Sequence, residues 1–96
     1  MARKIAFHLN CLEQGGAERV VSNLSNRFVE NGYEVLVATE WQGEDEFWID
    51  ERVRRVHVGL RPGDEKKGRL TQFFLRIRYL KEFLKKEKPD ILIPFA

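Results

Sequence analysis

The chain has one cysteine, two histidines and no apolar run long enough to cross a membrane. A single cysteine cannot form an internal disulfide, and two distant histidines with one cysteine make no zinc site. The N-terminus lacks the basic start, long apolar core and small-residue cleavage site of a signal peptide. The sequence therefore predicts a cytoplasmic protein with neither a metal site nor a disulfide.

The motifs of common nucleotide-binding enzymes are also incomplete. Dinucleotide binding needs three glycines spaced as GxGxxG, and only the pair Gly15 and Gly16 is present, although Glu40 follows the second predicted strand. The phosphate loop of ATPases needs a Gly-Lys-Ser/Thr ending, which is missing. No nucleophile–base pair can be named either. The sequence therefore gives no catalytic residue and predicts no bound cofactor.

What is present fits one small folded domain over residues 1–96. Apolar residues make up 43% of the 96 and charged residues 33%, as in ordinary globular proteins. A chain of this length buries roughly 60–65% of its unfolded surface. The net charge is only +2, but the segment 66–88 contains nine Lys or Arg and two Glu, a local charge of +7. Nucleic acid is not an expected partner, but a polyanion-binding module using this segment stays open as an alternative.

Apolar patterning predicts strands over residues 3–9, 34–39, 54–60 and 91–95. The first two are apolar on both faces, as in central parallel strands, whereas the third alternates as an edge strand does. A first helix should bury a stripe spaced by three and four residues, namely Ala17, Val20, Val21, Leu24 and Phe28, and end at Gly32. The prediction is an α/β fold with a Rossmann-like, mostly parallel sheet of about four strands and helices packed on it.

A second helix is predicted over residues 69–86, with two apolar stripes. The predicted core face comprises Leu70, Phe73, Phe74, Ile77, Leu80 and Leu84. Leu75, Tyr79 and Phe83 then fall on the outer face, where a second copy of the chain, another segment or an anionic membrane surface would cover them. The strand Ile91 to Phe95 is a second candidate for a homodimer contact, because an apolar edge strand can pair with another chain.

The strand–glycine–helix stretch from Ile5 to Val21 predicts an anion-binding turn. The first N–H groups of a helix lack internal partners and attract anions, and glycines at 15 and 16 can take unusual backbone angles and leave room for a ligand. Asn10 and Glu18 flank this turn. In the alternative interpretation, the glycines only make the turn and the Glu18 carboxylate satisfies the helix. His8 is predicted to be a hydrogen-bonded residue in the core or at its rim.

The same stretch carries a family resemblance. The segment from Leu12 to Val21, with Gly15-Gly16-Ala17-Glu18-Arg19 at its centre, resembles the opening of GT4-type glycosyltransferases of the GT-B fold. Asn31-Gly32-Tyr33-Glu34-Val35 and Glu87-Lys88-Pro89-Asp90 extend the resemblance over nearly all of the chain. Only Gly15 and Gly16 are carried over as site residues, because the matching loop in such enzymes lines the interdomain cleft near the donor diphosphate and the acceptor.

The resemblance implies an N-terminal, acceptor-side piece of an enzyme that moves a sugar from a nucleotide donor to a glycan or lipid-linked acceptor. The C-terminal nucleotide-sugar-binding domain would be a missing partner, and the family's histidine after the fourth strand lies beyond Ala96. The piece is therefore expected to be truncated and inactive alone, with the nucleotide sugar as substrate rather than cofactor. It would be cytoplasmic or peripheral at the inner face of the membrane. A non-enzymatic protein-interaction module is the alternative.

Overall fold

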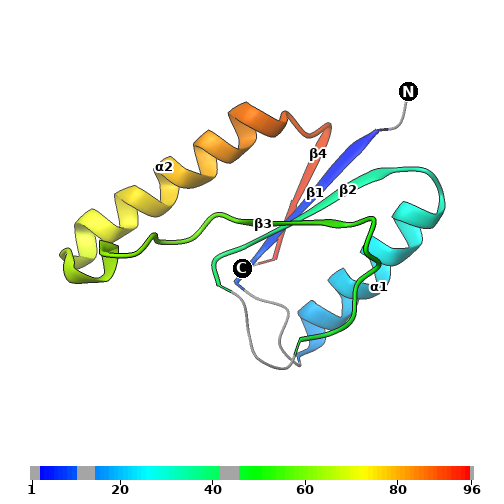
Figure 1. Ribbon diagram of the computed structural model, residues 1–96, viewed down its shortest axis with the longest axis horizontal. Coiled ribbons are helices and arrows are strands. Elements are labelled where there is room, and N and C mark those ends of the chain that lie inside the picture. Colours follow the sequence, from blue (N-terminus) through cyan, green and yellow to red (C-terminus); the bar gives the residue numbers. More distant parts are fainter. Residues whose placement is uncertain (1–2, 11–14, 42–45, 96) are drawn as a thin grey trace.

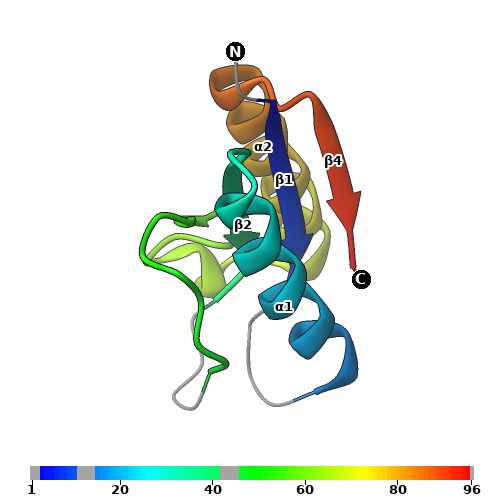
Figure 2. The ribbon, with the colours of Figure 1, turned by 90° about the vertical axis from the view of Figure 1, so that its right-hand side faces the viewer.

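A four-stranded parallel sheet with one long helix on each face forms the protein (Figures 1 and 2). The computed structural model describes residues 3–10, 15–41 and 46–95. The elements are, in order, β1 Lys4–Leu9, α1 Gly16–Glu30, β2 Glu34–Thr39, β3 Arg54–His57, the 3-10 helix η1 Asp64–Lys66, α2 Arg69–Glu87 and β4 Ile91–Pro94. The strand order is β3-β2-β1-β4, and every neighbouring pair is parallel. The predicted Rossmann-like α/β class is confirmed.

The core lies on both faces of the two central strands. Phe7 of β1 packs in one cluster with Val21 of α1, and Ala6 of β1 packs in a second cluster with Phe83 of α2. Successive residues of a strand point to opposite faces, so a strand that lies between two helices must be apolar at nearly every position. This explains why β1 and β2 lack the polar alternation of β3.

Helix α1 packs on the sheet through a face that differs from the predicted one. Ala17 and Val20 are exposed, so their prediction as core residues is wrong, whereas Val21 is fully buried. The buried face also includes Ser22, Ser25 and Val29. Small serine side chains let the helix lie close to its neighbours, and Ser22 Oγ donates a hydrogen bond to the backbone oxygen of Trp48 at 2.6 Å. The predicted C-terminal glycine, Gly32, has a positive φ of 88°.

Helix α2 reverses the predicted assignment of its two apolar stripes. Tyr79 and Phe83, predicted for the outer face, are buried, and Leu75 is half-buried. Four residues of the predicted core face are exposed, namely Leu70, Phe73, Phe74 and Ile77. Leu80 and Leu84 do pack partly against the sheet. The proposed contact through Leu75, Tyr79 and Phe83 is therefore misplaced, because these side chains already face the protein interior.

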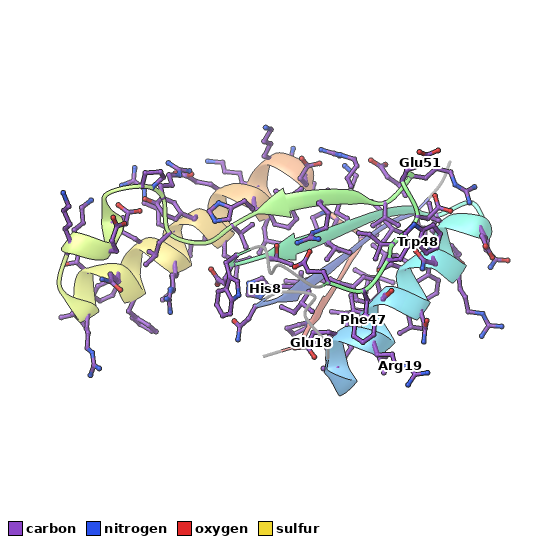
Figure 3. The ribbon with its side chains drawn as sticks, turned by 60° about the horizontal axis from the view of Figure 1, so that its bottom comes forward. His8, Glu18, Arg19, Phe47, Trp48 and Glu51 are labelled. Carbon is purple, nitrogen blue, oxygen red and sulfur yellow. The ribbon has the colours of Figure 1, made fainter. Side chains whose placement is uncertain are left out.

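The cause of the reversal is the place of α2 relative to the strands. Its N-terminal half extends beyond the carboxyl ends of the strands, while its C-terminal half lies over them (Figures 1 and 3). The early apolar residues therefore have no sheet beneath them. The hydroxyl of Tyr79 is satisfied inside the protein, since it donates to Asp64 Oδ2 at 2.7 Å. An aromatic residue with this polar end could thus be buried without a loss of hydrogen bonding.

Strands β3 and β4 form the two edges of the described sheet. β3 is shorter than predicted, because its ladder closes with the hydrogen bond from Val58 N to Thr39 O at 2.9 Å. The edge position predicted for this strand is confirmed. In β4, Pro94 lies opposite His8, and Phe95 N donates to His8 O at 2.7 Å. Pro94, which has no N–H, thus interrupts no hydrogen bond with β1.

Candidate functional site

The carboxyl ends of β1 and β2 bring two predicted residues together. Glu40 N and Trp41 N both donate to the backbone oxygen of Asn10, at 2.9 and 3.1 Å. In open parallel sheets, ligands bind in the crevice outside this edge. Asn10 therefore joins the two central strands by its backbone at the expected edge, and its exposed side chain is accessible there. The sequence predicts that Asn10 to Gly16, Glu40 to Gly43 and the end at Ala96 line this crevice; of these, residues 11–14, 42, 43 and 96 lie outside the described residues.

Gly15 and Gly16 form the start of α1, as predicted, but not with unusual backbone angles. Gly15 is the residue before the helix and has φ −166° and ψ 168°, which is extended backbone open to any residue. A Cβ on Gly15 would meet the Glu18 carboxylate, which is the movable end of a flexible side chain, whereas a Cβ on Gly16 would meet no atom within 4 Å. The surface above Gly16 is therefore open to a ligand.

Glu18 folds back over the start of its own helix (Figure 3). The first hydrogen bond of α1 runs from Arg19 N to Gly15 O at 3.0 Å, so the N–H groups of residues 16–18 have no partner inside the helix. A carboxylate at this end is stabilised by the helix dipole. Glu18 thus occupies the electrostatic position of an anion, and an incoming phosphate must displace it.

A second polar feature at this edge is the pair formed by His8 and Glu40. His8 Nε2 lies 3.5 Å from Glu40 Oε1, and both side chains are mostly buried. His8 Nε2 and Glu40 Oε2 are buried and, in the part of the chain that the structure describes, have no hydrogen-bond partner. The rim position predicted for His8 is confirmed, but the expected hydrogen bond is not made. By strand alternation the pair lies on the α2 face of the sheet, and α1 covers the other face.

Sequence reasoning missed the proximity of His8 and Glu40, although a signal existed. His8 pairs with Ala38 in the parallel register, and Glu40 follows two residues later on the same face of the sheet. It also missed Gly59, where a Cβ would collide with the backbone of Glu40. No local pattern reveals such an approach, since it depends on how β3 ends. A residue larger than glycine at 59 would push the β2 end away.

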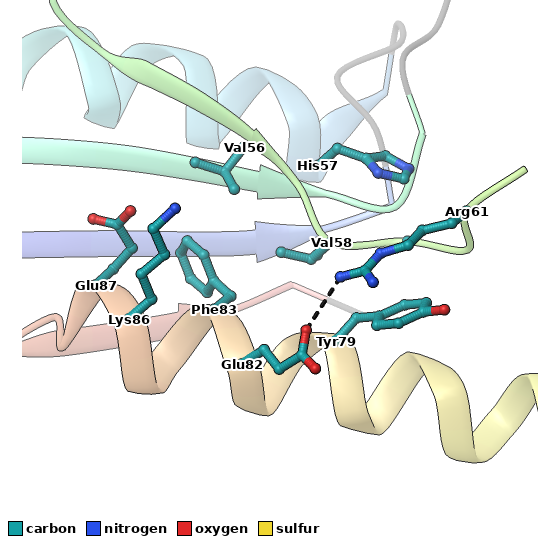
Figure 4. Close-up of a pocket in the computed structure, with 10 residues that line it drawn as sticks. Val56, His57, Val58, Arg61, Tyr79, Glu82, Phe83, Lys86 and Glu87 are labelled. Carbon is teal, nitrogen blue, oxygen red and sulfur yellow. Dashed lines mark hydrogen bonds and ion pairs between the residues drawn. The ribbon is translucent and has the colours of Figure 1, made fainter.

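A cavity of about 300 Å³ lies between the edge strand β3 and α2 (Figure 4). Its lining includes His57, Arg61, Tyr79 and Glu82. Arg61 lies over the Tyr79 ring at 4.0 Å and bonds to Glu82 Oε2 at 3.1 Å. These contacts attach the loop after β3 to α2, so Arg61, Tyr79 and Glu82 already serve the fold.

Asp64 is the centre of that attachment. The backbone N–H of Arg61 and the hydroxyl of Tyr79 both donate to its carboxylate and, with Lys67, lower the pKa of Asp64 to about 2. The same hydrogen bond raises the pKa of Tyr79. Hydrogen bonding that favours the ionised carboxylate is the physical cause of this lowering. The group is therefore an anionic anchor and not a proton donor.

The described residues contain neither a cluster of metal ligands nor a membrane-spanning helix. Over residues 3–10, 15–41 and 46–95, no group of three or more His, Cys, Asp or Glu side chains could hold a metal ion. Within those same ranges, no helix is long and apolar enough to span a bilayer.

Comparison with known proteins identifies the family of this chain. The family model for Glycosyltransferase Family 4 matches residues 14–95, which include the glycine turn and Glu18. Among solved structures the chain is similar to WaaG, a glycosyltransferase involved in lipopolysaccharide biosynthesis, with 17% identity and a TM-score of 0.72. This likeness shows a GT-B type fold and covers 96% of this chain but 23% of the WaaG chain. No curated protein matches the chain. The match over most of its length shows that the chain belongs to glycosyltransferase family 4.

Proposed function

We propose that this chain is the acceptor-side part of a glycosyltransferase that moves a sugar from a nucleotide donor to a glycan or lipid-linked acceptor. The observation that carries the proposal is the family match over residues 14–95, which begins at the glycine turn. In this proposal a second, nucleotide-sugar-binding domain completes the cleft, and the 96-residue chain alone has no turnover. The nucleotide sugar is a substrate, so no further cofactor is needed.

The open start of α1 would take the donor diphosphate or a charged group of the acceptor. Three N–H groups without a partner inside the helix and the positive end of the helix dipole favour an anion there, and Gly16 leaves room for it to approach the backbone. Glu18 opposes this binding until its carboxylate turns away. The isolated chain should therefore bind phosphate or UDP weakly, and the missing half of the cleft would supply the rest of the affinity.

The test is a titration of the ¹⁵N-labelled chain with UDP, followed by amide chemical shifts. Shifts should concentrate on residues 15–19, disappear in Gly16→Val, and grow in Glu18→Gln because the competing negative charge is removed. Gly68→Val is the control, since Gly68 lies directly before α2 and, as at Gly16, its Cβ would meet no atom within 4 Å. Shifts that stay unchanged in Gly16→Val, or that map only to other regions, would refute the proposed site.

A polyanion-binding module is the competing function, and the arrangement of charge argues against it. Lys81 and Lys85 lie beside one face of α2, whereas Lys86 lines the separate cavity next to β3. The basic residues are thus divided between two surfaces. Salt-dependent binding to heparin that is lost on joint reversal of Lys81, Lys85 and Lys86 would favour the polyanion function.

A further inference from the structure

A second hollow, of about 360 Å³, lies where β2 and β3 end. Its lining consists of Thr39, Trp41, Arg55, Val56 and His57. Trp41 is 48% exposed, and its backbone N–H donates to the oxygen of Asn10 at 3.1 Å. The hollow therefore lies beside the sheet edge at which ligands bind in folds of this class.

The charge on Arg55 is compensated inside the protein. Arg55 Nη1 donates to Glu46 Oε1 at 2.8 Å, while Nη2 donates to Glu46 Oε2 at 3.4 Å and to the Thr39 hydroxyl at 3.1 Å. The Arg55 and Glu46 side chains are only 27% and 11% exposed. An anion in the hollow would meet the repulsion of the Glu46 carboxylate beside the guanidinium. The hollow therefore favours an uncharged ligand that can accept a hydrogen bond from Arg55.

We propose that this hollow binds one pyranose ring of a glycan, stacked on Trp41. One face of a pyranose presents C–H groups with slightly positive hydrogens, and the face of an aromatic ring is negative. The sugar hydroxyls both donate and accept. Arg55 supplies donors, whereas the Thr39 hydroxyl and the neutral imidazole of His57 can do both.

The size of the hollow limits this ligand. Ligand pockets in proteins have volumes of about 300–1,000 Å³, and the hollow at Trp41, at about 360 Å³, lies near the lower limit. Its volume suits one sugar unit better than several. A longer glycan would place one terminal ring here and leave the next units in solvent.

The other tryptophan of the chain has a different setting. Trp48 is 72% exposed and lies beside α1 on the segment that leads into β3 (Figure 3). The hollow next to it contains two acids and one base, Asp50, Glu51 and Arg52. Arg52 already forms an ion pair with Asp50 at 2.9 Å. Trp48 is therefore an exposed aromatic residue without the neutral, hydrogen-bonding walls around Trp41, and it serves as an internal control.

Sugar binding at this hollow would have a direct use at the sheet edge. In the proposed glycosyl transfer, the bound ring would be a unit of the acceptor glycan, held beside Asn10. Only this assignment rests on the proposed function; binding of the ring itself does not. The UDP titration at Gly16 examines the proposed function separately, so either result can fail without the other.

The test uses the two tryptophans as separate fluorescent reporters during titration with methyl glucoside, a single pyranose ring. Trp48→Phe leaves Trp41 as the only tryptophan of the chain, and its emission should change saturably. Trp41→Phe leaves Trp48, whose emission should stay constant. Sorbitol, an open-chain polyol without a ring face, should give no saturable change in either variant. Uridine tests whether a nucleobase stacks on Trp41 instead.

A pair of threonine variants in the Trp48→Phe background tests the polar wall. Thr39→Val removes the hydroxyl at nearly constant volume and should weaken sugar binding about two- to ten-fold, as expected for one hydrogen bond. Thr71→Val is the matched control, because Thr71 is exposed on α2, and it should bind sugar as its parent does. Equal affinities of these two variants would overturn the proposal.

The fluorescence titrations can also overturn it. A constant emission from Trp41, an equal change at Trp48, or an equal response to sorbitol would each show that no sugar ring stacks in the hollow. A saturable response to uridine without one to methyl glucoside would replace the sugar by a nucleobase as the occupant.

Discussion

The burial of Phe83 and the exposure of Phe74 make a direct prediction for stability. The two residues lie on the same helix, but Phe83 is 6% exposed and packs on Ala6 and Leu36, whereas Phe74 is 60% exposed. The same substitution at both positions, Phe→Leu, changes helix propensity equally and so isolates the effect of burial. Phe83→Leu leaves part of a packed site empty, and Phe74→Leu does not.

The expected magnitudes follow from this difference in burial. Phe83→Leu should lower the free energy of unfolding by about 1 kcal/mol, as for a shape change in a close-packed core, and Phe83→Ala by about 3 kcal/mol or more. Phe74→Leu should stay within about 0.5 kcal/mol of the wild type. In a domain of this size, 1 kcal/mol lowers the Tm by about 4–8 °C.

Thermal and urea unfolding, followed by far-UV circular dichroism, measure the stability of both variants. The reasoning requires that Phe83→Leu lowers the Tm and the urea midpoint while Phe74→Leu leaves them nearly unchanged. The opposite order would mean that α2 packs through the stripe with Leu70 and Phe74, as the sequence had predicted. Equal losses at both sites would refute the account of a helix that is only half supported by the sheet.

Three further predictions concern Gly59, the hydrogen bond between Tyr79 and Asp64, and Glu18. Gly59→Ala should destabilise the protein by about 1–3 kcal/mol, since the new Cβ collides with the Glu40 backbone, while Gly16→Ala should not; chemical unfolding of both variants decides this. Because folding lowers the pKa of Asp64 from 3.8 to about 2, its stabilising effect is present above pH 3.8 and lost as pH falls toward 2. Tyr79→Phe removes one cause of that lowering and should make acid unfolding begin at higher pH, whereas an unchanged acid midpoint would contradict this cause. Glu18→Gln should strengthen phosphate binding at the start of α1, and a weaker response in the phosphate titration would count against competition by the carboxylate.

The sequence alone was sufficient to predict the strands that are buried on both faces. β1 and β2 have unbroken apolar runs, and a run of this kind in a short strand has no other stable position than the middle of a parallel sheet. The glycine after α1 was equally readable, because Gly32 takes a positive φ that other residues avoid. These features depend on local chemistry, so they can be derived without knowledge of the packing.

The periodicity of apolar residues does not determine which face of each helix packs on the sheet. On α2, both apolar stripes have the correct spacing, and the choice between them follows from where the strands end beneath the helix. The hydrogen bond from Tyr79 to Asp64 further favours burial of the stripe with the aromatic hydroxyl. Likewise, the proximity of Gly59 to Glu40 and of His8 to Glu40 arises from strand register and from how β3 ends. Such contacts join residues distant in sequence, and no single segment reveals them.

The most direct test of the proposed function is a crystal structure of the chain with bound UDP. The account predicts a diphosphate oxygen at about 3 Å from the backbone nitrogen of Gly16 or Ala17, with the Glu18 carboxylate turned away from Gly15. A diphosphate bound instead by Lys81 and Lys85 on α2, with Glu18 still folded over Gly15, would contradict it.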